Sequence, residues 1–331
     1  MQQTVTPDSL FQVATGYMAS KHLFVAAEIG LFEHIADSGS TLDELSARIG
    51  VPRRTLRMVA DAMVALGFVE RRGDLYLNGP VAATFLAGRT PADLRPMMRF
   101  WNRLSYPRWL SLEPAVRTDG ATAGGYHVGF TPEDQRIFSE GVESVTAGAA
   151  QALASGYDFA RHRRVIDIGG GTGSFLIFIL TRHPHLEGTL FELPAVTGLA
   201  RERIASSAMA SQIDVLEGDF SKDAIPRGHD AAILANIIHG LSPEQNLTLL
   251  RAIRDTMQPA ARLLIVDFWT DPTHTDPMFA ALMAGEFLVN ASNGDVYSRA
   301  EGESWLRQTG WRQVDHLPLV GPASVLVGEA V

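Results

Sequence analysis

Residues 165–175 read VIDIGGGTGSF, and this stretch decides the fold. A short apolar run, interrupted by Asp167, has the composition of a buried strand. It leads into a glycine-rich turn, and an apolar helical pattern follows over residues 173–182. A strand, a glycine turn and a helix in this order are typical of the unit that opens a doubly wound α/β sheet.

The rest of the C-terminal half repeats the alternation of strand and helix. Such alternation needs crossover connections, which join parallel strands. The sequence therefore predicts an α/β fold with a doubly wound, Rossmann-like sheet. Strands are expected at 164–168, 188–192, 213–217, 230–236 and 262–268, and helices around 173–182, 195–206 and 243–257.

Composition narrows the class of protein. The 331 residues carry 28 basic and 37 acidic side chains, are 46% hydrophobic and include no cysteine, which excludes a disulfide scaffold and a thiol nucleophile. The apolar run 263–269 is far shorter than the ~20 residues of a membrane-spanning helix, and the N-terminus lacks a basic segment followed by an apolar one. We expect two domains in a soluble, cytoplasmic protein without a membrane partner.

The N-terminal region, 1–105, is chemically distinct, with 11 Lys/Arg against 10 Asp/Glu. Apolar residues recur at helical spacing over 14–35, the segment TLDE at 41–44 is placed as a capping box, and a third helical pattern covers 54–66. Two extended runs around a charged turn follow over 67–77. Helix, helix, helix, hairpin is the order of a winged helix.

Helix 14–35 carries more apolar side chains than a ~100-residue domain needs for its own core, which predicts a homodimer. These side chains are Tyr17, Met18, Leu23, Phe24, Leu31 and Phe32. The same pattern admits a regulator that reads DNA with Arg53, Arg54 and Arg57. Nucleic-acid-binding domains are strongly basic, whereas this region has a net charge of +1 within a chain of −9, so we expect no nucleic-acid partner.

The glycine loop carries the first chemical signal. Its glycines at 169, 171 and 173 give G-x-G-x-G, and Ser174 breaks the dinucleotide fingerprint. A strand-borne carboxylate such as Asp167 would repel a pyrophosphate but suits a cation, and S-adenosylmethionine presents an ammonium and a sulfonium. The alternative is a tight turn that merely needs glycines.

Acidic side chains also follow the next strands. Glu192, at the end of the second strand, is placed to accept both ribose hydroxyl hydrogens. After the third strand, Asp219 offers an acceptor for the adenine amino group, and Phe220 offers an aromatic face. The alternative for each acid is a solvated strand end.

Several segments together resemble the bacterial and plant small-molecule O-methyltransferases. They are residues 165–173, FELP at 191–194, EGDF at 217–220, NIIHGLSPEQN at 236–246, LLIVDFW at 263–269 and WLRQTGW at 305–311. The resemblance implies an S-adenosylmethionine-dependent O-methyltransferase of bacterial secondary metabolism that acts on an aromatic hydroxyl. It also implies a winged-helix-like dimerisation domain (1–105), a helical connector that covers the substrate pocket (106–155) and a class I methyltransferase domain (156–331). The expected cofactor residues are Asp167, Gly169, Gly171, Glu192, Asp219 and Phe220.

The family's catalytic histidine corresponds to His239, although its usual Asp-Trp neighbours are Gly240 and Leu241 here. Of the two acids that flank this histidine in plant members, one position matches Asp267 and the other matches Val296. An imidazole with a pKa near ~6.5 can take the proton of a phenol at neutral pH. The alternatives are a histidine that caps the helix beginning at 242–243, and, for the enzyme, N- or C-methylation or chemistry without methyl transfer.

Large apolar residues above the sheet edge predict a pocket for a flat aromatic acceptor, since such pockets are mostly apolar. Each of them alone is equally consistent with core packing. The sequence does not name the acceptor, and nothing in it requires a metal. The set is Met97, Phe100, Trp101, Tyr126, Phe130, Trp269, Met278, Phe279, Met283 and Phe287, with Trp101, Phe130, Trp269, Phe279 and Met283 the strongest candidates.

Overall fold

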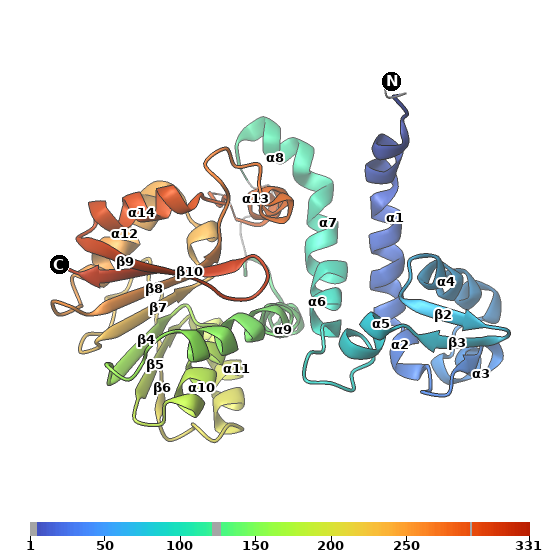
Figure 1. The fold of residues 1–331 in the computed structure, drawn as a ribbon, viewed down its shortest axis with the longest axis horizontal. Coiled ribbons are helices and arrows are strands. Elements are labelled where there is room, and N and C mark those ends of the chain that lie inside the picture. Colours follow the sequence, from blue (N-terminus) through green and yellow to red (C-terminus); the bar gives the residue numbers. More distant parts are fainter. Residues whose placement is uncertain (1–4, 121–126, 292) are drawn as a thin grey trace. The chain divides into compact units, whose positions relative to one another are not determined.

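The chain divides into two compact units, Met1–Pro107 and Arg108–Val331. A computed structural model describes residues 5–120, 127–291 and 293–331 (Figure 1). The segment 106–155, expected as a connector, contributes its long helix α9 (Pro132–Gly156) to the second unit, where it packs against α10 (Ser174–Arg182).

The N-terminal unit follows the predicted order of three helical segments and a hairpin. Among the described residues its strands form an antiparallel three-stranded sheet in the order β1-β3-β2. The predicted capping box is present, since Thr41 and Glu44 exchange hydrogen bonds at the start of α3. The elements are α1 (Asp8–Glu28), α2 (Leu31–His34), β1 (Ser40–Thr41), α3 (Leu42–Ile49), α4 (Arg53–Ala65), β2 (Val69–Arg72), β3 (Leu75–Asn78), α5 (Pro80–Phe85), α6 (Arg95–Phe100) and a π-helical turn (Trp101–Ser105).

The prediction of one helix over 14–35 is wrong in its extent. The helix begins earlier, at Asp8, and stops at Glu28. Gly30 has a φ of 71°, a left-handed conformation that ends a right-handed helix, and the short helix α2 starts after it. The apolar spacing continues through this break into α2, whose Leu31 and Phe32 are buried, whereas Ala26 is the buried residue of α1.

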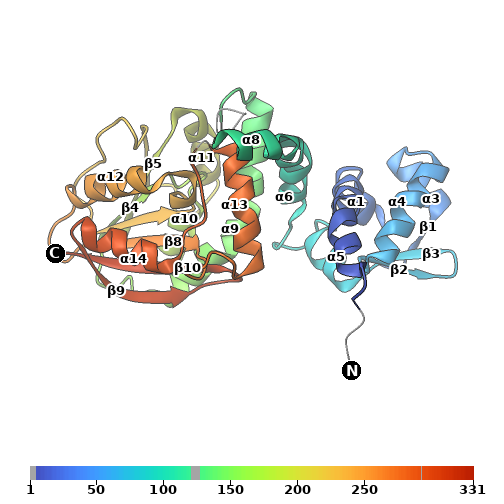
Figure 2. The same ribbon diagram turned by 90° about the horizontal axis from the view of Figure 1, so that it is seen from above.

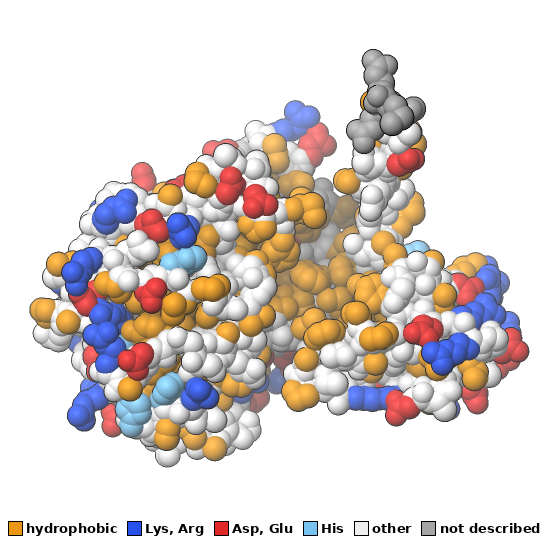
Figure 3. All heavy atoms as spheres, viewed as in Figure 1, with side chains coloured by type: hydrophobic (Ala, Val, Ile, Leu, Met, Phe, Trp, Pro, Cys, Tyr) orange, Lys and Arg blue, Asp and Glu red, His pale blue; other side chains and the backbone are white. Residues whose placement is uncertain are grey.

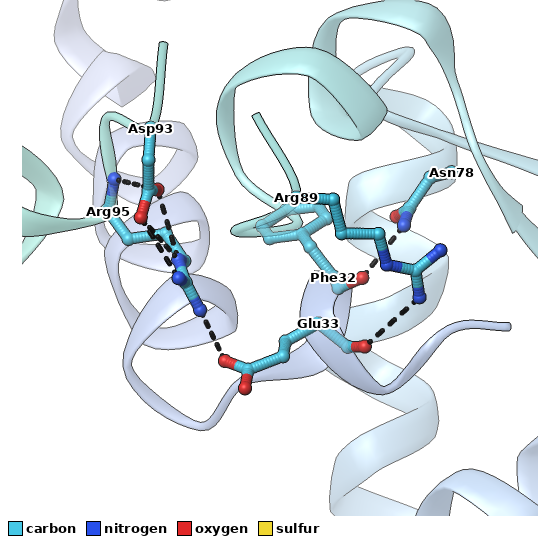
Figure 4. Close-up of polar contacts among 6 residues, drawn as sticks. All are labelled: Phe32, Glu33, Asn78, Arg89, Asp93 and Arg95. Carbon is cyan, nitrogen blue, oxygen red and sulfur yellow. Dashed lines mark hydrogen bonds and ion pairs between the residues drawn. The ribbon is translucent and has the colours of Figure 1, made fainter. Parts of the chain in front are cut away.

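Helix α2 is too short to satisfy its own carbonyl groups, and side chains from later segments do so (Figure 4). Asn78 Nδ2 donates to the carbonyl of Phe32 over 2.7 Å, and Arg89 Nη2 donates to the carbonyl of Glu33 over 3.5 Å. Arg95 pairs with the carboxylates of Asp93 and Glu33. The contacts of Arg89 and Arg95 hold the segment between α5 and α6 against α2, and the contact of Asn78 holds β3 against it.

The second unit contains the predicted doubly wound sheet. Among the described residues it has seven strands in the order β6-β5-β4-β7-β8-β10-β9, and β6, β5, β4, β7 and β8 are parallel. The five predicted strands are confirmed within one residue at each end. The strands are β4 (Arg164–Ile168), β5 (Glu187–Glu192), β6 (Ile213–Glu217), β7 (Ala231–Ala235), β8 (Arg262–Phe268), β9 (Trp311–Pro318) and β10 (Ala323–Ala330).

Helices cover both faces of this sheet (Figures 1 and 2). Side chains alternate along β4, so that Val165 packs in the core against α9, α10 and α11, while Ile166 and Ile168 pack in the core against α12 and α14. None of the helices in the described part of the chain is long and apolar enough to cross a membrane. The remaining helices are α7 (Tyr106–Arg108), α8 (Leu112–Thr118), α11 (Pro194–Ala205), α12 (Pro243–Arg254), α13 (Met278–Asn290) and α14 (Arg299–Gln308), with 3-10 turns at Trp109–Ser111 and Ile238–Gly240.

The strands β9 and β10 were not among the predicted strands. They form a hairpin that pairs antiparallel with β8, so the sheet is mixed rather than wholly parallel. Trp311 is the one fully buried residue of β9, and Arg312 and Asp315 are exposed, because β9 is an edge strand with one solvated face. A search for continuous apolar runs misses a strand of this kind.

Candidate active site

The carboxyl ends of β4, β5, β7 and β8 meet at one edge of the sheet, near the point where the strand order reverses between β4 and β7. In a doubly wound sheet this edge is where ligands bind. Asp167 lies at the end of β4, Glu192 ends β5, and Asp267 is the penultimate residue of β8. The turn that holds His239 follows β7.

The glycine loop after β4 has a backbone that other residues would strain. Gly169, Gly171 and Gly173 have φ values of 67°, 60° and 86°, in the left-handed region. Gly170 is required for a different reason: a Cβ atom there would lie 2.3 Å from the Cγ of Asp167. The importance of Gly170 comes from that tertiary contact, so the glycine motif alone does not distinguish it from its neighbours.

Glu192 is buried and holds the loop through backbone amides. Its Oε2 accepts from the amide of Gly171 over 2.7 Å, and its Oε1 accepts from the amide of Leu193 over 2.6 Å. Burial raises the pKa of this carboxyl, and the two amide hydrogen bonds oppose that shift. Each oxygen retains a lone pair that can accept a further hydrogen bond, as from a ribose hydroxyl.

Asp167 is fully buried, and neither of its carboxylate oxygens has a hydrogen-bond partner among the described residues. Burial raises the pKa of Asp167 to about 8, and repulsion from Glu192 adds to the shift. A buried carboxyl with two unused acceptors fits a ligand that brings a cationic donor. The ammonium of S-adenosylmethionine is such a group.

Asp219 and Phe220 follow β6 but differ in availability. Burial favours a higher pKa for Asp219, yet hydrogen bonds from Lys222 and Ser221 outweigh it and lower the pKa overall. Its oxygens are thus occupied by local donors. Phe220 is half-buried, and its ring lies 3.3 Å from where a Cβ on Gly169 would stand, so it borders the loop.

His239 and Asp267 are brought together by the fold. His239 Nδ1 lies 2.8 Å from Asp267 Oδ1, which also accepts from the amide of Phe268 over 2.9 Å. Since the carboxylate oxygen acts as acceptor, we assign the proton of the neutral imidazole to Nδ1, which leaves the lone pair on Nε2. Asp267 is almost completely buried, and its second oxygen has no partner among the described residues.

Aromatic rings hold the imidazole where a second acid is missing. Val296 is buried against Phe287, and Phe287 stacks on His239 with ring centroids 4.0 Å apart and planes 13° apart. Phe268 stacks on the same imidazole at 5.3 Å. The position of the second family acid thus belongs to an apolar support for the ring.

The alternative of a helix cap is not supported for His239. The cap of α12 is Ser242, whose hydroxyl accepts from the amide of Gln245. Asn246, fully buried, donates to the carbonyls of Ile238 and Leu241 and so fixes the turn around His239. The role of Asn246 could not be predicted, because a local sequence pattern does not distinguish a buried amide side chain from an exposed one.

The predicted pocket residues fall into several groups. Phe279 meets Phe268 edge-on at 5.7 Å, and Met283 packs against the cluster that contains Phe287, so these residues of α13 contact the side chains that stack on the histidine. Phe130 lies in a separate ring cluster with His127 and Phe138. Met97, Phe100 and Trp101 belong to the N-terminal unit, and Tyr126 lies outside the described residues.

Trp269 requires a correction. It packs in the core against α14, where its ring fills the space beside Gly302 and Leu326. The side chain after β8 turns into the core because the strand alternates its faces, and Phe268 takes the position beside His239. We therefore leave Trp269 out of the candidate pocket.

Two family models match the chain. An O-methyltransferase domain matches residues 116–312, and an O-methyltransferase dimerisation domain matches residues 11–88. The chain belongs to the O-methyltransferase family. Within the parts of this O-methyltransferase that are described, no three His, Asp or Glu side chains are grouped as metal ligands would be.

Relatives match along nearly the whole O-methyltransferase chain. A 3-hydroxy-5-methyl-1-naphthoate 3-O-methyltransferase of Streptomyces sahachiroi is 34% identical over 96% of this chain and 93% of its own. A tetracenomycin polyketide synthesis 8-O-methyl transferase of Streptomyces glaucescens is 30% identical over 97% and 96%. A solved structure of PigF with SAH has a TM-score of 0.89 at 27% identity, and covers 98% of this chain and 100% of its own.

Asp167 should make binding of the expected cofactor depend on pH. With a pKa of about 8, most of its carboxyl is protonated at pH 7 in the ligand-free protein, and a cation favours the ionised form. Binding of S-adenosylhomocysteine should therefore release a proton at pH 7, and affinity should rise from pH 6 to 7.5. Calorimetry in buffers of different ionisation enthalpy measures this release. Asp167→Asn should abolish it, and proton-neutral binding by the wild type would contradict the assignment.

Two neighbouring glycines should respond differently to alanine. Gly170→Ala forces the Asp167 carboxylate to move, which should lower stability by about 1–3 kcal/mol and weaken binding of S-adenosylhomocysteine. Gly171→Ala meets no protein atom within 4 Å, so its stability should fall only by the backbone strain of its φ, about 1–2 kcal/mol, although its new side chain would stand on the side of the proposed cofactor. Urea unfolding and calorimetry on both variants measure these effects. A Gly170→Ala variant as stable as the wild type would refute the contact as the reason for a glycine at 170.

Proposed function

We propose that the chain transfers a methyl group from S-adenosylmethionine to a hydroxyl oxygen of an aromatic small molecule in bacterial secondary metabolism. The observation that carries this proposal is the pairing of His239 with Asp267 at the same sheet edge as the loop between Asp167 and Glu192. The pair of His239 and Asp267 supports a general base. The loop between Asp167 and Glu192 supports the binding of a cationic cofactor that carries a ribose.

Each of the proposed cofactor residues would contact a different part of the cofactor. Asp167 would receive the ammonium, Glu192 the ribose hydroxyls, and Phe220 would lie against the adenine, with Asp219 the weaker candidate because its oxygens are occupied. Bound S-adenosylmethionine supplies an electrophilic methyl group on its sulfonium. The glycine loop lets backbone come close to the ligand, since Gly169 and Gly171 carry no side chain there.

The base acts through one atom. His239 Nε2 accepts the proton of the acceptor hydroxyl, while Asp267 keeps Nδ1 protonated and stabilises the imidazolium that forms. Phe268 and Phe287 hold the plane of the ring by stacking on it. Proximity and orientation of the acceptor provide most of the rate in such a displacement, and the base adds to it.

An aromatic acceptor suits the surroundings of His239. Phe268, Phe279, Met283 and Phe287 place apolar surface beside the imidazole. A relative named for a hydroxylated naphthoate, with 34% identity, supports the same substrate class. Trp101 and Phe130 remain proposed pocket residues on the sequence argument.

The test is incubation with labelled S-adenosylmethionine and a panel of phenolic, naphthoic and heteroaromatic acceptors, with products identified by mass spectrometry. We expect a gain of one methyl on oxygen for a hydroxylated aromatic acceptor. The replacement of the family's Asp-Trp by Gly240 and Leu241 makes N- or C-methylation the second candidate, and fragmentation of the product separates the three outcomes. Cofactor binding without transfer to any acceptor in the panel would contradict the proposal.

His239→Ala should lower kcat by about 10²–10⁴-fold and leave the affinity for S-adenosylhomocysteine nearly unchanged. Asp267→Asn should lower kcat by a smaller factor than His239→Ala does, since the stacked rings still hold the imidazole. The exposed His185→Ala serves as control. Wild-type turnover by His239→Ala across pH 6–9 would make His239 structural.

We also propose a homodimer built on α1. Tyr17 and Met18 are 55% and 48% exposed, and hydrophobic side chains line this helix (Figure 3). The expectation that Leu31 and Phe32 add to this surface is wrong, because both are fully buried in the core of their own unit. The match to an O-methyltransferase dimerisation domain over residues 11–88 supports the assembly.

Light scattering at micromolar concentration should give twice the 35.9 kDa of one chain. Tyr17→Asp combined with Met18→Asp should shift the protein toward the monomer, because charges replace buried apolar contacts. Met58→Asp, an equally exposed methionine on α4, is the matched control and should stay dimeric. A wild-type protein of 36 kDa would overturn the proposal.

We infer that nucleic acid is not a partner. Arg53 pairs with Asp43 over 2.5 Å, and Arg57 pairs with Asp61 over 2.8 Å, so two of the three candidate arginines are matched by acids. Basic and acidic side chains are intermixed on the visible face of this unit (Figure 3). A DNA-binding surface needs a continuous basic patch.

A further inference from the structure

Glu143, in the middle of α9, joins three elements of the second unit. Its side chain is 14% exposed. One oxygen accepts hydrogen bonds from the hydroxyls of Thr172 and Ser174, and the other pairs with the guanidinium of Arg203 on α11. A carboxylate with this set of partners has most of its hydrogen-bonding capacity satisfied.

The two hydroxyl partners of Glu143 lie on the glycine loop and at its end. Thr172 and Ser174 flank Gly173, which has a φ of 86° and is the N-cap of α10. Gly171, the residue before Thr172, donates its amide to Glu192. Two carboxylates therefore hold consecutive residues of one loop, Glu192 through the backbone and Glu143 through side chains.

A loop of four glycines in five residues needs such restraint. Glycine has more backbone freedom to lose than any other residue, so a glycine loop without side-chain contacts samples many conformations. A ligand that binds one of them has its affinity reduced by the fraction of molecules in that conformation. Contacts that hold the binding conformation in advance raise the affinity.

The charge of Glu143 also suits its place. It lies at the N-terminal end of α10, where a negative charge is favoured by the helix dipole. Arg203 balances this charge, so that Glu143 binds the loop without requiring a further cation.

We propose that Glu143 is a positioning residue for S-adenosylmethionine: it holds the glycine loop in its binding conformation through Thr172 and Ser174. The inference rests on the proposed function, which assigns this loop to the cofactor. Glu143 acts through the loop and is not itself a ligand of the cofactor.

The test measures binding of S-adenosylhomocysteine by calorimetry in the full-length protein. Glu143→Ala should weaken binding by about 10- to 100-fold, the range expected when one or two charge-assisted hydrogen bonds are lost. In the methyl-transfer assay KM for S-adenosylmethionine should rise, while kcat at saturating cofactor and KM for the acceptor change by no more than about threefold, an effect on ground-state binding alone. Glu140→Ala, one turn earlier on α9 at an exposed ion pair with Arg136, should leave binding unchanged.

Thr172→Val provides a second route if Glu143→Ala does not fold. It removes one hydroxyl of the loop, keeps the pair between Glu143 and Arg203, and should weaken binding in the same direction by a smaller factor. In a double variant the two effects should be less than additive, because they remove the same contact.

The outcomes separate the inference from the function on which it rests. A lower melting temperature with unchanged affinity in Glu143→Ala and Thr172→Val would make the contact purely structural and overturn the inference alone. Failure of the wild type to bind S-adenosylhomocysteine would overturn the proposed function together with it.

Discussion

The burial of Asp167 is the constraint on which the site depends. A carboxylate with no partner among the described residues stands at the end of β4, in space that only a glycine at 170 leaves open. Burying such a group is unfavourable unless a partner is supplied. Its raised pKa means that the folded state holds a proton that the unfolded chain loses near pH 4. Stability is therefore lost as pH rises from about 4 to 8 in the absence of a cation.

The features that suit this site to a ligand lower the stability of the ligand-free fold. The glycines of the loop, the unpartnered oxygens of Asp167 and the buried Glu192 all disfavour the ligand-free fold. Hydrogen bonds that the amide of Gly171 donates to Glu192 and that the hydroxyl of Thr172 donates to Glu143 offset part of that disadvantage. The seven-stranded sheet with a core on each face makes the rest of the fold stable enough to tolerate it.

The part of the candidate site around His239 is held in place by other contacts. His239 has one carboxylate partner, and Val296, which packs against the stacked Phe287, occupies the position where the resemblance leads one to expect a second acid. A ring held by stacking keeps its plane, while the hydrogen bond to Asp267 sets the tautomer. The neighbours Gly240 and Leu241 therefore need not supply orientation, because Asn246 fixes the turn from the following helix.

Local patterns determined much of this protein. The five parallel strands follow from apolar runs of strand length, the capping boxes at Thr41 and Ser242 from short polar motifs, and the loop from its glycines. Asp167, Glu192, His239 and Asp267 were predictable as strand-end residues because parallel strands bring their carboxyl ends to one edge. These features depend on residues that lie a few positions apart in the chain, so they can be predicted from the sequence directly.

Tertiary structure decided what depends on contacts between distant segments. β10 pairs with β8 and carries β9 with it at the edge of the sheet, although the polar sequence of β9 resembles a surface segment. Trp269 turns into the core while Phe268 and Phe287 reach the histidine, and neither choice is visible in composition. The need for glycine at 170 and the hydrogen bond between Thr172 and Glu143 also depend on residues that the fold brings together from different elements. Hydrogen bonds and packing act over a few ångströms of space whatever the separation along the chain, so only the folded coordinates reveal them.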